Sequence, residues 1–342
     1  MNAPAPKLRI AVRRADLDAE RARIDGFVAE HPDGTIFHRP QWSRAVERGC
    51  GQRAHFLLAE RGGALVGLLP LTEIRSLLFG NALVSAGFGT GGGILGDGAG
   101  ALADAAWALG YPGVELRGGP VPDGWEAASG TYAGFTRDLP ADAQTLLAAI
   151  PKRQRAEVRK ALETTLATSA GRDRRHRDAH FRVYSESVRN LGTPVFPRAL
   201  FAAALDEFGE EADVTIAWLD GRPLAALLNF YFKGAVHPYW GGGVSAARKA
   251  RANDLVQFDV MRRAIERGCT RADFGRSKIG TGPWSRKRIW GFEETPLTYA
   301  VRGERREVNP LNPKYRLQIA AWSRLPLWLA NRIGPLIARG LG

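Results

Sequence analysis

The chain has 342 residues, 45% of them hydrophobic, and its 48 Lys and Arg against 35 Asp and Glu give a formal net charge of +13. This length exceeds what one hydrophobic core usually serves, so two domains are expected, and the composition excludes a largely disordered chain. Cys50 and Cys269 are too few for a disulfide framework or a structural zinc site, which favours a reducing, cytoplasmic compartment.

The first residues lack the apolar stretch of a secretory signal, and no apolar run is long enough to span a membrane. The excess of positive charge indicates an anionic partner, which would be a nucleic acid, a phosphorylated metabolite or an acidic membrane surface.

The expected elements fall into two similar series. The first series predicts helices near 16–30 and 40–49, strands near 54–60, 64–71 and 81–86, a helix near 99–109 and a strand near 113–118. The second predicts helices near 181–190 and 197–208, strands near 213–219, 223–232 and 235–241, a helix near 252–267 and a strand near 271–276. Residues 141–175 lie between the two series and predict a helical connector that is broken at Pro151.

Two pairs of segments share almost the same offset of 158 or 159 residues. The segments HFLLAERGGALVGLLPL and VTIAWLDGRPLAALLNF each predict a hairpin, with turns at Gly62-Gly63 and Asp220-Gly221. The segments ADAAWALGYPGVELRGG and MRRAIERGCTRADFGRS each predict a helix that ends in glycine, at Gly110 and Gly268, before a strand. A shared offset indicates duplication of an α/β module with a mixed sheet covered by helices.

Two familiar motifs are incomplete. Residues 87–92 match the glycine spacing of a dinucleotide-binding loop, but no helix can begin directly after them, so we reject that interpretation. His176 and His180 have the spacing of a zinc-binding helix, but Arg177 occupies the place of the catalytic Glu. Their polar surroundings predict a solvated basic segment, and no metal site is expected.

Residues 273–291 are the stretch of the chain that is richest in candidate binding and catalytic residues. They contain four glycines, five cations and two tryptophans in a predicted loop after a strand. Glycine permits close approach of backbone to a ligand, and the cations suit phosphates or a developing oxyanion. A second cationic group, on one predicted helix face, is either solvated or binds phosphate, and it comprises Lys152, Arg155 and Arg159.

Residues 311–342 mix tryptophan, leucine and isoleucine with arginine, and Pro326 and Pro335 interrupt them. An interfacial helix that contacts the membrane peripherally has this composition, and packing against the protein's own domains explains it equally well.

The stretches FHRPQWSRAVERGCG, LVGLLPL, GTPVFP (192–197) and DFGRSK followed by GTGPWSRKRIWG resemble the FemAB-like peptidyltransferases of the GNAT acyltransferase superfamily. The resemblance covers about residues 35–300 and is strongest to FemAB-like proteins associated with exosortase (PEP-CTERM) exopolysaccharide systems. It implies an α/β fold of two tandem GNAT-like domains, with mixed sheets flanked by helices, plus an amphipathic helical tail at the C-terminus. The expected boundaries are a first domain at 1–140, a connector at 141–175, a second domain with the main site at 176–305 and the tail at 306–342.

The resemblance implies an N-acyl or aminoacyl transferase that acts on an amine of a cell-envelope or exopolysaccharide precursor, at the inner face of the cytoplasmic membrane. The donor would be acyl-CoA or aminoacyl-tRNA, with no tightly bound cofactor. Lys287 matches the family's late lysine and would stabilise the carbonyl or a phosphate, and Asp273 would accept a proton or orient Arg276. The remaining expected substrate contacts are Arg276, Ser277, Lys278, Tyr239, Trp240, Trp284, Arg286 and Trp290.

Arg286 stands where the family has an aromatic residue, and 241–260 lacks the CoA pyrophosphate motif of ordinary GNAT enzymes. Asn253 is expected to cap the helix that follows it. Two alternatives remain: a nucleic-acid-binding module without catalysis, for tRNA or another nucleic acid, and a non-catalytic GNAT-like scaffold in a polysaccharide export system.

Overall fold

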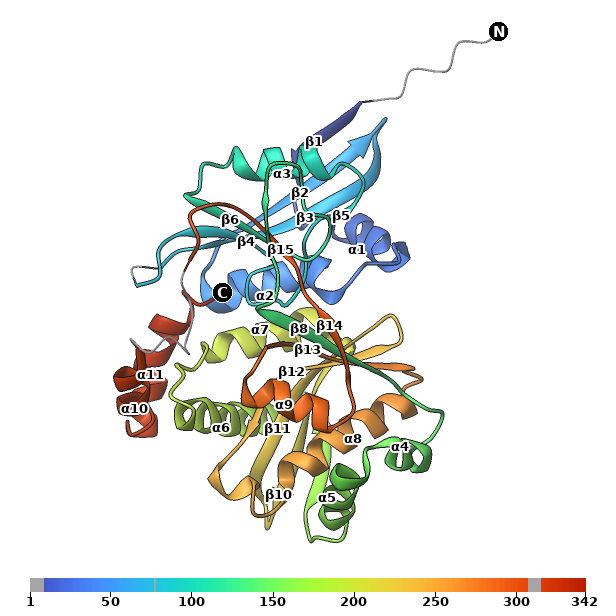
Figure 1. Cartoon of the computed structure of the whole chain (residues 1–342), viewed down its shortest axis with the longest axis vertical. Helices are drawn as coiled ribbons and strands as arrows, with labels where there is room; N and C mark the ends of the chain where they lie inside the picture. Colours follow the sequence, from blue (N-terminus) through green and yellow to red (C-terminus); the bar gives the residue numbers. More distant parts are fainter. Residues whose placement is uncertain (1–8, 77, 307–314) are drawn as a thin grey trace. The chain divides into compact units, whose positions relative to one another are not determined.

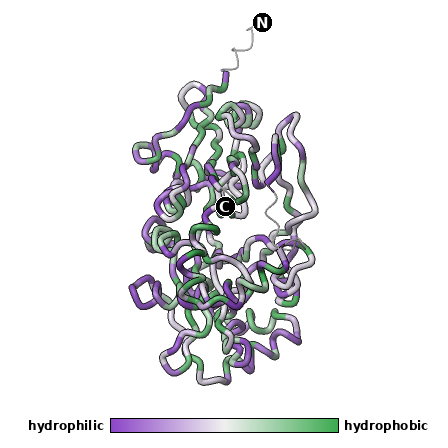
Figure 2. Tube along the Cα trace, turned by 90° about the vertical axis from the view of Figure 1, so that its left-hand side faces the viewer, coloured by the Kyte–Doolittle hydropathy of each residue, from purple (hydrophilic) through white to green (hydrophobic). Residues whose placement is uncertain are grey.

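The computed structural model describes residues 9–76, 78–306 and 315–342, which form two compact units (Figure 1). The first unit contains Met1–Ala128, Thr298–Glu307 and Gly340–Gly342, and the second contains Ser129–Leu297 and Val308–Arg339. Hydrophobic segments run through the interior, and many loops are hydrophilic (Figure 2).

The first unit is built on a mixed sheet with the strand order β1-β2-β3-β4-β6-β15-β7, and β5 pairs with β3. Its strands are β1 (Ile10–Arg14), β2 (Ala54–Arg61), β3 (Ala64–Ile74), β4 (Ala82–Ser85), β5 (Leu95–Gly96), β6 (Gly113–Arg117), β7 (Glu126–Ala128) and β15 (Tyr299–Gly303). Its helices are α1 (Arg21–Glu30), η1 (Ile36–His38), α2 (Pro40–Cys50) and α3 (Ala99–Trp107). One core cluster packs α3 against strands β2, β3, β4 and β6.

The second unit is built on a sheet with the order β14-β8-β13-β12-β11-β10-β9. Its strands are β8 (Tyr132–Asp138), β9 (Ala167–Gly171), β10 (Ala212–Leu219), β11 (Arg222–Phe232), β12 (Ala235–Gly243), β13 (Arg271–Lys278) and β14 (Glu293–Pro296). Its helices are α4 (Ala143–Ala149), α5 (Lys152–Leu162), α6 (Arg174–Asn190), α7 (Arg198–Phe208), η2 (Gly209–Glu211), η3 (Ser245–Ala247), α8 (Ala252–Glu266), α9 (Gly282–Ile289), α10 (Arg316–Trp322) and α11 (Leu327–Ala338). Helices α6 and α7 pack on one face of the sheet and α8, with α5, on the other.

The two sheets have the same internal topology. In each, an antiparallel hairpin (β2–β3 or β10–β11) is followed by a third antiparallel strand, a crossover helix and a parallel strand, β6 or β13. The next position in each sheet is filled from the other half of the chain: β8 lies between β13 and β14, and β15 lies between β6 and β7. The expected tandem α/β architecture is confirmed, with an exchange of strands that the sequence did not indicate.

The expected turns have the backbone that their residues predict. Gly62, Gly63, Asp220 and Gly221 all have positive φ, which a tight hairpin turn requires at both central positions. Gly110 and Gly268 also have positive φ, just beyond the ends of α3 and α8.

Several elements differ from the expectation. The predicted loop after Arg276 is instead the end of β13 followed by α9, because Thr281 accepts a hydrogen bond from the Trp284 amide and Pro283 suits the first helical turn. The predicted helix at 16–30 begins only at Arg21, after the edge strand β1. The helix predicted at 181–190 begins at Arg174, where Asp173 caps it.

The tail after the second unit's sheet folds as α10 and α11, and residues 307–314 lie outside the described part. Among the helices that the structure describes, none combines the length and apolar character that crossing a bilayer requires.

Candidate active site

Strands β12 and β13 diverge at the centre of the second sheet. They are parallel neighbours, but their ladder covers only the pairs Ala235–Arg271 and Val236–Ala272. Beyond Val236, the β12 edge that faces β13 therefore carries no ladder pairing in the described chain, although β12 continues to Gly243. The register between β11 and β12 also shifts, between the pairs Leu228–Trp240 and Asn229–Pro238. Ligands commonly bind at the carboxyl ends of parallel strands where such an opening forms.

His237 and Asp273 lie side by side where the two strands begin to diverge. Nδ1 of His237 is 3.5 Å from Oδ2 of Asp273, and Oδ1 of Asp273 accepts a 2.8 Å hydrogen bond from the Gly275 amide. Burial raises the pKa of Asp273. The hydrogen bond and charge of His237, the Gly275 amide and the charge of Lys287 lower it by more, so the pKa of Asp273 lies below its usual value. Asp273 is therefore ionised and orients the imidazole.

Lys287 reaches from α9 to a bulge in β13. Its Nζ donates to the carbonyl oxygens of Phe274, Gly275 and Arg276, at 2.5, 3.2 and 3.1 Å, and lies 5.2 Å from the centre of the Phe135 ring. Burial lowers the pKa of Lys287 to about 8, and the charge of Asp273 offsets part of this effect. An ammonium group has three N–H donors, so these three carbonyls engage all of them.

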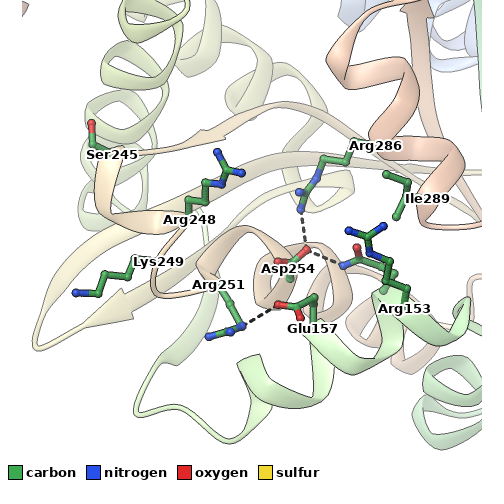
Figure 3. A pocket seen from close by; sticks show the side chains of 10 residues that line it. Arg153, Glu157, Ser245, Arg248, Lys249, Arg251, Asp254, Arg286 and Ile289 are labelled. Atoms are coloured by element: carbon green, nitrogen blue, oxygen red, sulfur yellow. Dashed lines mark hydrogen bonds and ion pairs between the residues drawn. The ribbon is translucent and has the colours of Figure 1, made fainter.

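A cationic pocket of about 730 Å³ lies at the carboxyl end of β12, between α5, the β12–α8 connection and α9 (Figure 3). It is lined by Arg153, Gln154, Glu157, Ser245, Arg248, Lys249, Arg251, Asp254, Arg286 and Ile289. Five of these residues are cationic and two are acidic, so the lining carries a formal net charge of +3.

The two acidic side chains do not neutralise this pocket. Arg286 donates to Oδ1 of Asp254 at 2.9 Å, and Arg251 donates to Glu157, also at 2.9 Å (Figure 3). Arg153, Arg248 and Lys249 form no ion pair in the described chain. Helix α8 starts here with no side-chain cap, so the positive end of its dipole adds to the attraction for an anion.

The predicted residues of 273–291 are only partly brought together. Arg286 lines the cationic pocket, whereas Arg276 lies over the Tyr132 ring at 4.4 Å, and Ser277 is buried in β13. Trp284 donates its indole N–H to Glu294 at 2.8 Å and has the Arg288 guanidinium 4.5 Å from its ring centre. Lys278 is half-buried at the end of β13.

Two tryptophans expected to contact substrate belong to the interior. Trp290 is 0% exposed and lies in the core cluster beneath α8, and Trp240 is 5% exposed and packs on Phe201. Tyr239 is half-buried, 4.9 Å from the Trp240 ring. An indole ring has a large apolar area. Burial in the core removes more of that area from water than a place in the wall of an open pocket would, which favours the interior for both rings.

The predicted phosphate face of α5 does not line the pocket. Lys152, Arg155 and Arg159 are absent from its lining, and Arg155 instead donates to the Ala148 carbonyl at 2.5 Å. Arg153, on the same helix, faces the pocket. The sequence analysis also missed His237 and the cations of the β12–α8 connection, Arg248, Lys249 and Arg251. The run Arg248-Lys249-Ala250-Arg251 just before a predicted helix was the signal for them.

His176 and His180 are not part of a solvated segment. His180 is 1% exposed in α6, where its Nε2 bonds the Trp240 carbonyl at 2.9 Å, and burial lowers its pKa to about 4. His176 bonds Asp173 and Ser169. The described residues contain no group of three or more His, Cys, Asp or Glu side chains placed to hold a metal.

Asn253 does not cap α8. The helix begins one residue earlier, at Ala252, with Arg251 in the capping position, and the Asn253 side chain lies against Gly243.

Comparison with known proteins identifies related folds. Residues 151–284 match the model of the acetyltransferase (GNAT) domain, and no curated protein sequence matches significantly. The crystal structure of FemX superposes with a TM-score of 0.67 at 16% identity, covering 90% of this chain and 99% of that one. The C-terminal domain of a putative lysylphosphatidylglycerol synthetase from Agrobacterium fabrum gives 0.56 at 14% identity, covering 84% and 93%. A tandem GNAT protein of clavulanic acid biosynthesis gives 0.53 at 11% identity, covering 86% and 98%.

These findings define the fold as two tandem GNAT-like domains. The domain match over residues 151–284 supports an acyltransferase as the general class of activity.

Proposed function

We propose that the protein transfers an acyl or aminoacyl group from a phosphate-bearing donor to an amine. The observation that carries the proposal is the pocket with a net charge of +3 at the carboxyl end of β12, beside the divergence of β12 and β13. Arginine and lysine side chains and a helix N-terminus bind phosphate oxygens well. Beyond the two ladder pairs of β12 and β13, the divergence of the strands would give an extended acyl arm room beside β12.

The two parts of this site are far enough apart to suit a long donor. Gly243 lies six residues beyond His237 along β12, and this length of extended strand spans roughly 20 Å. The donor's phosphates would bind at Arg248, Lys249 and the start of α8, and its acyl carbonyl would lie near His237. Both acyl-CoA and the 3′ end of an aminoacyl-tRNA have this layout, with phosphates distant from the reacting carbonyl.

Transfer would be direct. The amine nitrogen attacks the acyl carbonyl and forms the new C–N bond, and His237 takes the proton that the amine loses. A backbone N–H group near the divergence of β12 and β13 would stabilise the oxyanion, because the donors of Lys287 already bond the Phe274, Gly275 and Arg276 carbonyls. The bond from the carbonyl carbon to the donor then breaks, and the thiolate or ribose oxygen leaves with its electron pair and takes up a proton.

For the acceptor, we propose an amine of a cell-envelope or exopolysaccharide precursor, on the cytoplasmic side. The support is the sequence resemblance to FemAB-like proteins of PEP-CTERM systems and the likeness to FemX and to lysylphosphatidylglycerol synthetases, which by their name join lysine to a lipid.

Calorimetric titration with acetyl-CoA and with aminoacyl-tRNA tests the donor site. We expect one of them to bind, and Arg248→Ala to weaken binding at least tenfold, since a charge-assisted contact contributes about 1.5–3 kcal/mol. Arg174→Ala is the matched control, because Arg174 is an exposed arginine of α6 outside this pocket. Equal losses in both variants would contradict the site.

Turnover separates the remaining alternatives. His237→Gln should retain donor binding and lose transfer by at least a hundredfold, as removal of a general base does. If tRNA binds with steep salt dependence and no amine is ever acylated, the protein is a nucleic-acid-binding module. If neither donor binds, the fold serves as a scaffold.

A further inference from the structure

The outer face of the two C-terminal helices is unusually apolar. Five large hydrophobic side chains of the described residues are more than 60% exposed, and four of them lie on α10, α11 and the end of α6. They are Leu191 (70%), Leu317 (84%), Trp328 (69%) and Leu336 (65%). We call these four residues, with Arg324 and Arg332, the C-terminal surface.

Helix α11 is oriented with its small residues inward. Ala330, Gly334 and Ala338 form its buried stripe, and a Cβ at Gly334 would lie only 3.0 Å from Val195. Close packing through small residues leaves the large apolar side chains of the helix directed outward, at Trp328 and Leu336. A helix that serves only to complete a core has the opposite arrangement.

This surface is held in place on the second unit. Asn331 donates to Ser185 of α6 at 3.5 Å, and Arg189 of α6 donates to the Ser323 carbonyl at 3.2 Å. Ile319 packs directly on Gly192. The helices that carry the exposed residues are therefore already docked on the second unit and need no folding step to meet a partner.

The positive charge of residues 315–342 favours an anionic partner for the C-terminal surface. Residues 315–342 contain four arginines and no aspartate or glutamate. Along α11, Arg332 lies one helical turn from both Trp328 and Leu336, so cationic and apolar side chains alternate on one line. Association with a second copy through this face would bring arginines against arginines.

We infer that the C-terminal surface docks on an anionic lipid bilayer, with Trp328, Leu317 and Leu336 entering the interface and the arginines contacting lipid phosphates. Tryptophan and leucine beside arginine suit the headgroup boundary, and each cation near an anionic surface adds to the attraction. The inference stands on this surface alone and does not depend on the proposed transferase activity. The C-terminal helices would then both pack on the protein and contact a membrane, because one side of α11 packs on α6 and the other side would meet lipid.

Vesicle flotation of the full chain tests this inference. With vesicles of phosphatidylcholine and phosphatidylglycerol, the wild type should float, and raised salt or pure phosphatidylcholine should reduce the bound fraction strongly. Trp328→Gln with Leu336→Gln should weaken binding at least tenfold, because the variant loses two large apolar side chains that would leave water at the interface. Arg332→Glu should weaken binding to the anionic vesicles only.

Leu78→Gln is the matched control, because Leu78 is equally exposed (67%) in the first unit. All substituted side chains are exposed, so thermal melting should be unchanged and loss of folding would not imitate loss of binding. Equal flotation of the double variant and the wild type would overturn the inference. So would a concentration-dependent dimer that disappears in the double variant, since a second copy would then be the partner.

Discussion

Lys287 holds three consecutive carbonyl groups of β13 at the bulge beside Asp273. From the sequence, its family motif predicts direct contact with the reacting carbonyl or a phosphate. Its geometry favours a positioning role instead, in which it fixes the strand segment that carries Asp273 and, through it, the imidazole of His237.

Replacing Lys287 with Met separates these two roles. We expect Lys287→Met to lower the free energy of unfolding by about 1–3 kcal/mol, because buried carbonyls lose their donor, and to reduce transfer as well. Chemical denaturation measures this, with the exposed Lys160→Met as the control, which should change stability by less than about 0.5 kcal/mol. If Lys287→Met loses transfer but keeps its stability, Lys287 contacts the reacting carbonyl or a phosphate directly.

The pKa of Lys287 gives a second test. Since the folded pKa is about 8 and the ordinary value is 10.5, the unfolded chain binds a proton between these pH values that the folded chain has released. Stability of the wild type relative to Lys287→Met should therefore rise with pH across this window, by up to about 3 kcal/mol, and stay level below pH 8. A constant difference from pH 7 to 10 would contradict the assignment.

At the scale of elements, close packing of α11 depends on Gly334. Gly334→Val would place methyl groups inside the space occupied by Val195, so we expect α11 to separate from α6. Hydrogen exchange of residues 327–338 should then accelerate at least tenfold. Gly100→Ala, in the open first turn of α3 where no atom lies within 4 Å, should change nothing or stabilise slightly. Unchanged exchange in Gly334→Val would show that α11 is held by other contacts.

The elements recognised from the sequence are those that local residues determine. Both hairpins and their Gly or Asp turns, the crossover helices α3 and α8 and the strands that follow them lie close to where the pattern predicted. The exceptions depend on distant partners. β8 and β15 become strands because each pairs with strands that lie far away in the sequence, β8 with β13 and β14 and β15 with β6 and β7, and no local periodicity encodes that pairing.

The candidate site also combines residues that the sequence pattern indicated with residues that only the fold brings together. Of the predicted residues in 273–291, Arg286 lines the cationic pocket and Asp273 lies at the strand divergence, and their functional roles remain predictions. Sequence spacing could not show that Trp290 turns inward, or that His237 is brought beside Asp273 from a strand 36 residues earlier.

For the whole molecule, the duplication is visible in buried polar pairs as well as in topology. His55 and Glu73 of the first unit are in contact at 3.4 Å, and Asp213 accepts a 2.9 Å hydrogen bond from Tyr231 in the second. Each residue of the first pair precedes its counterpart by 158 residues, which is the offset of the sequence repeat. The same structural positions therefore hold a polar pair in both units, with different residue types.

His38 in the first unit and His180 in the second are buried and neutral. Burial lowers the pKa of both His38 and His180 to about 4, although each bonds a backbone carbonyl. Because the unfolded chain binds protons at higher pH than the folded chain, stability should fall as pH drops below 6.5, by about 2 kcal/mol per histidine at pH 5. Urea denaturation from pH 7 to 5 measures this, and each His→Gln variant should flatten the profile. A level wild-type profile would contradict the assignment.

The central claim is that the cationic pocket and the divergence of β12 and β13 bind one donor. Hydrogen–deuterium exchange of the whole protein, with and without acetyl-CoA or aminoacyl-tRNA, tests it most directly. We expect at least one donor to slow exchange in both 236–255 and 272–289 and to leave β2 and β3 unchanged. Protection by neither donor, or protection confined to other segments, would contradict it.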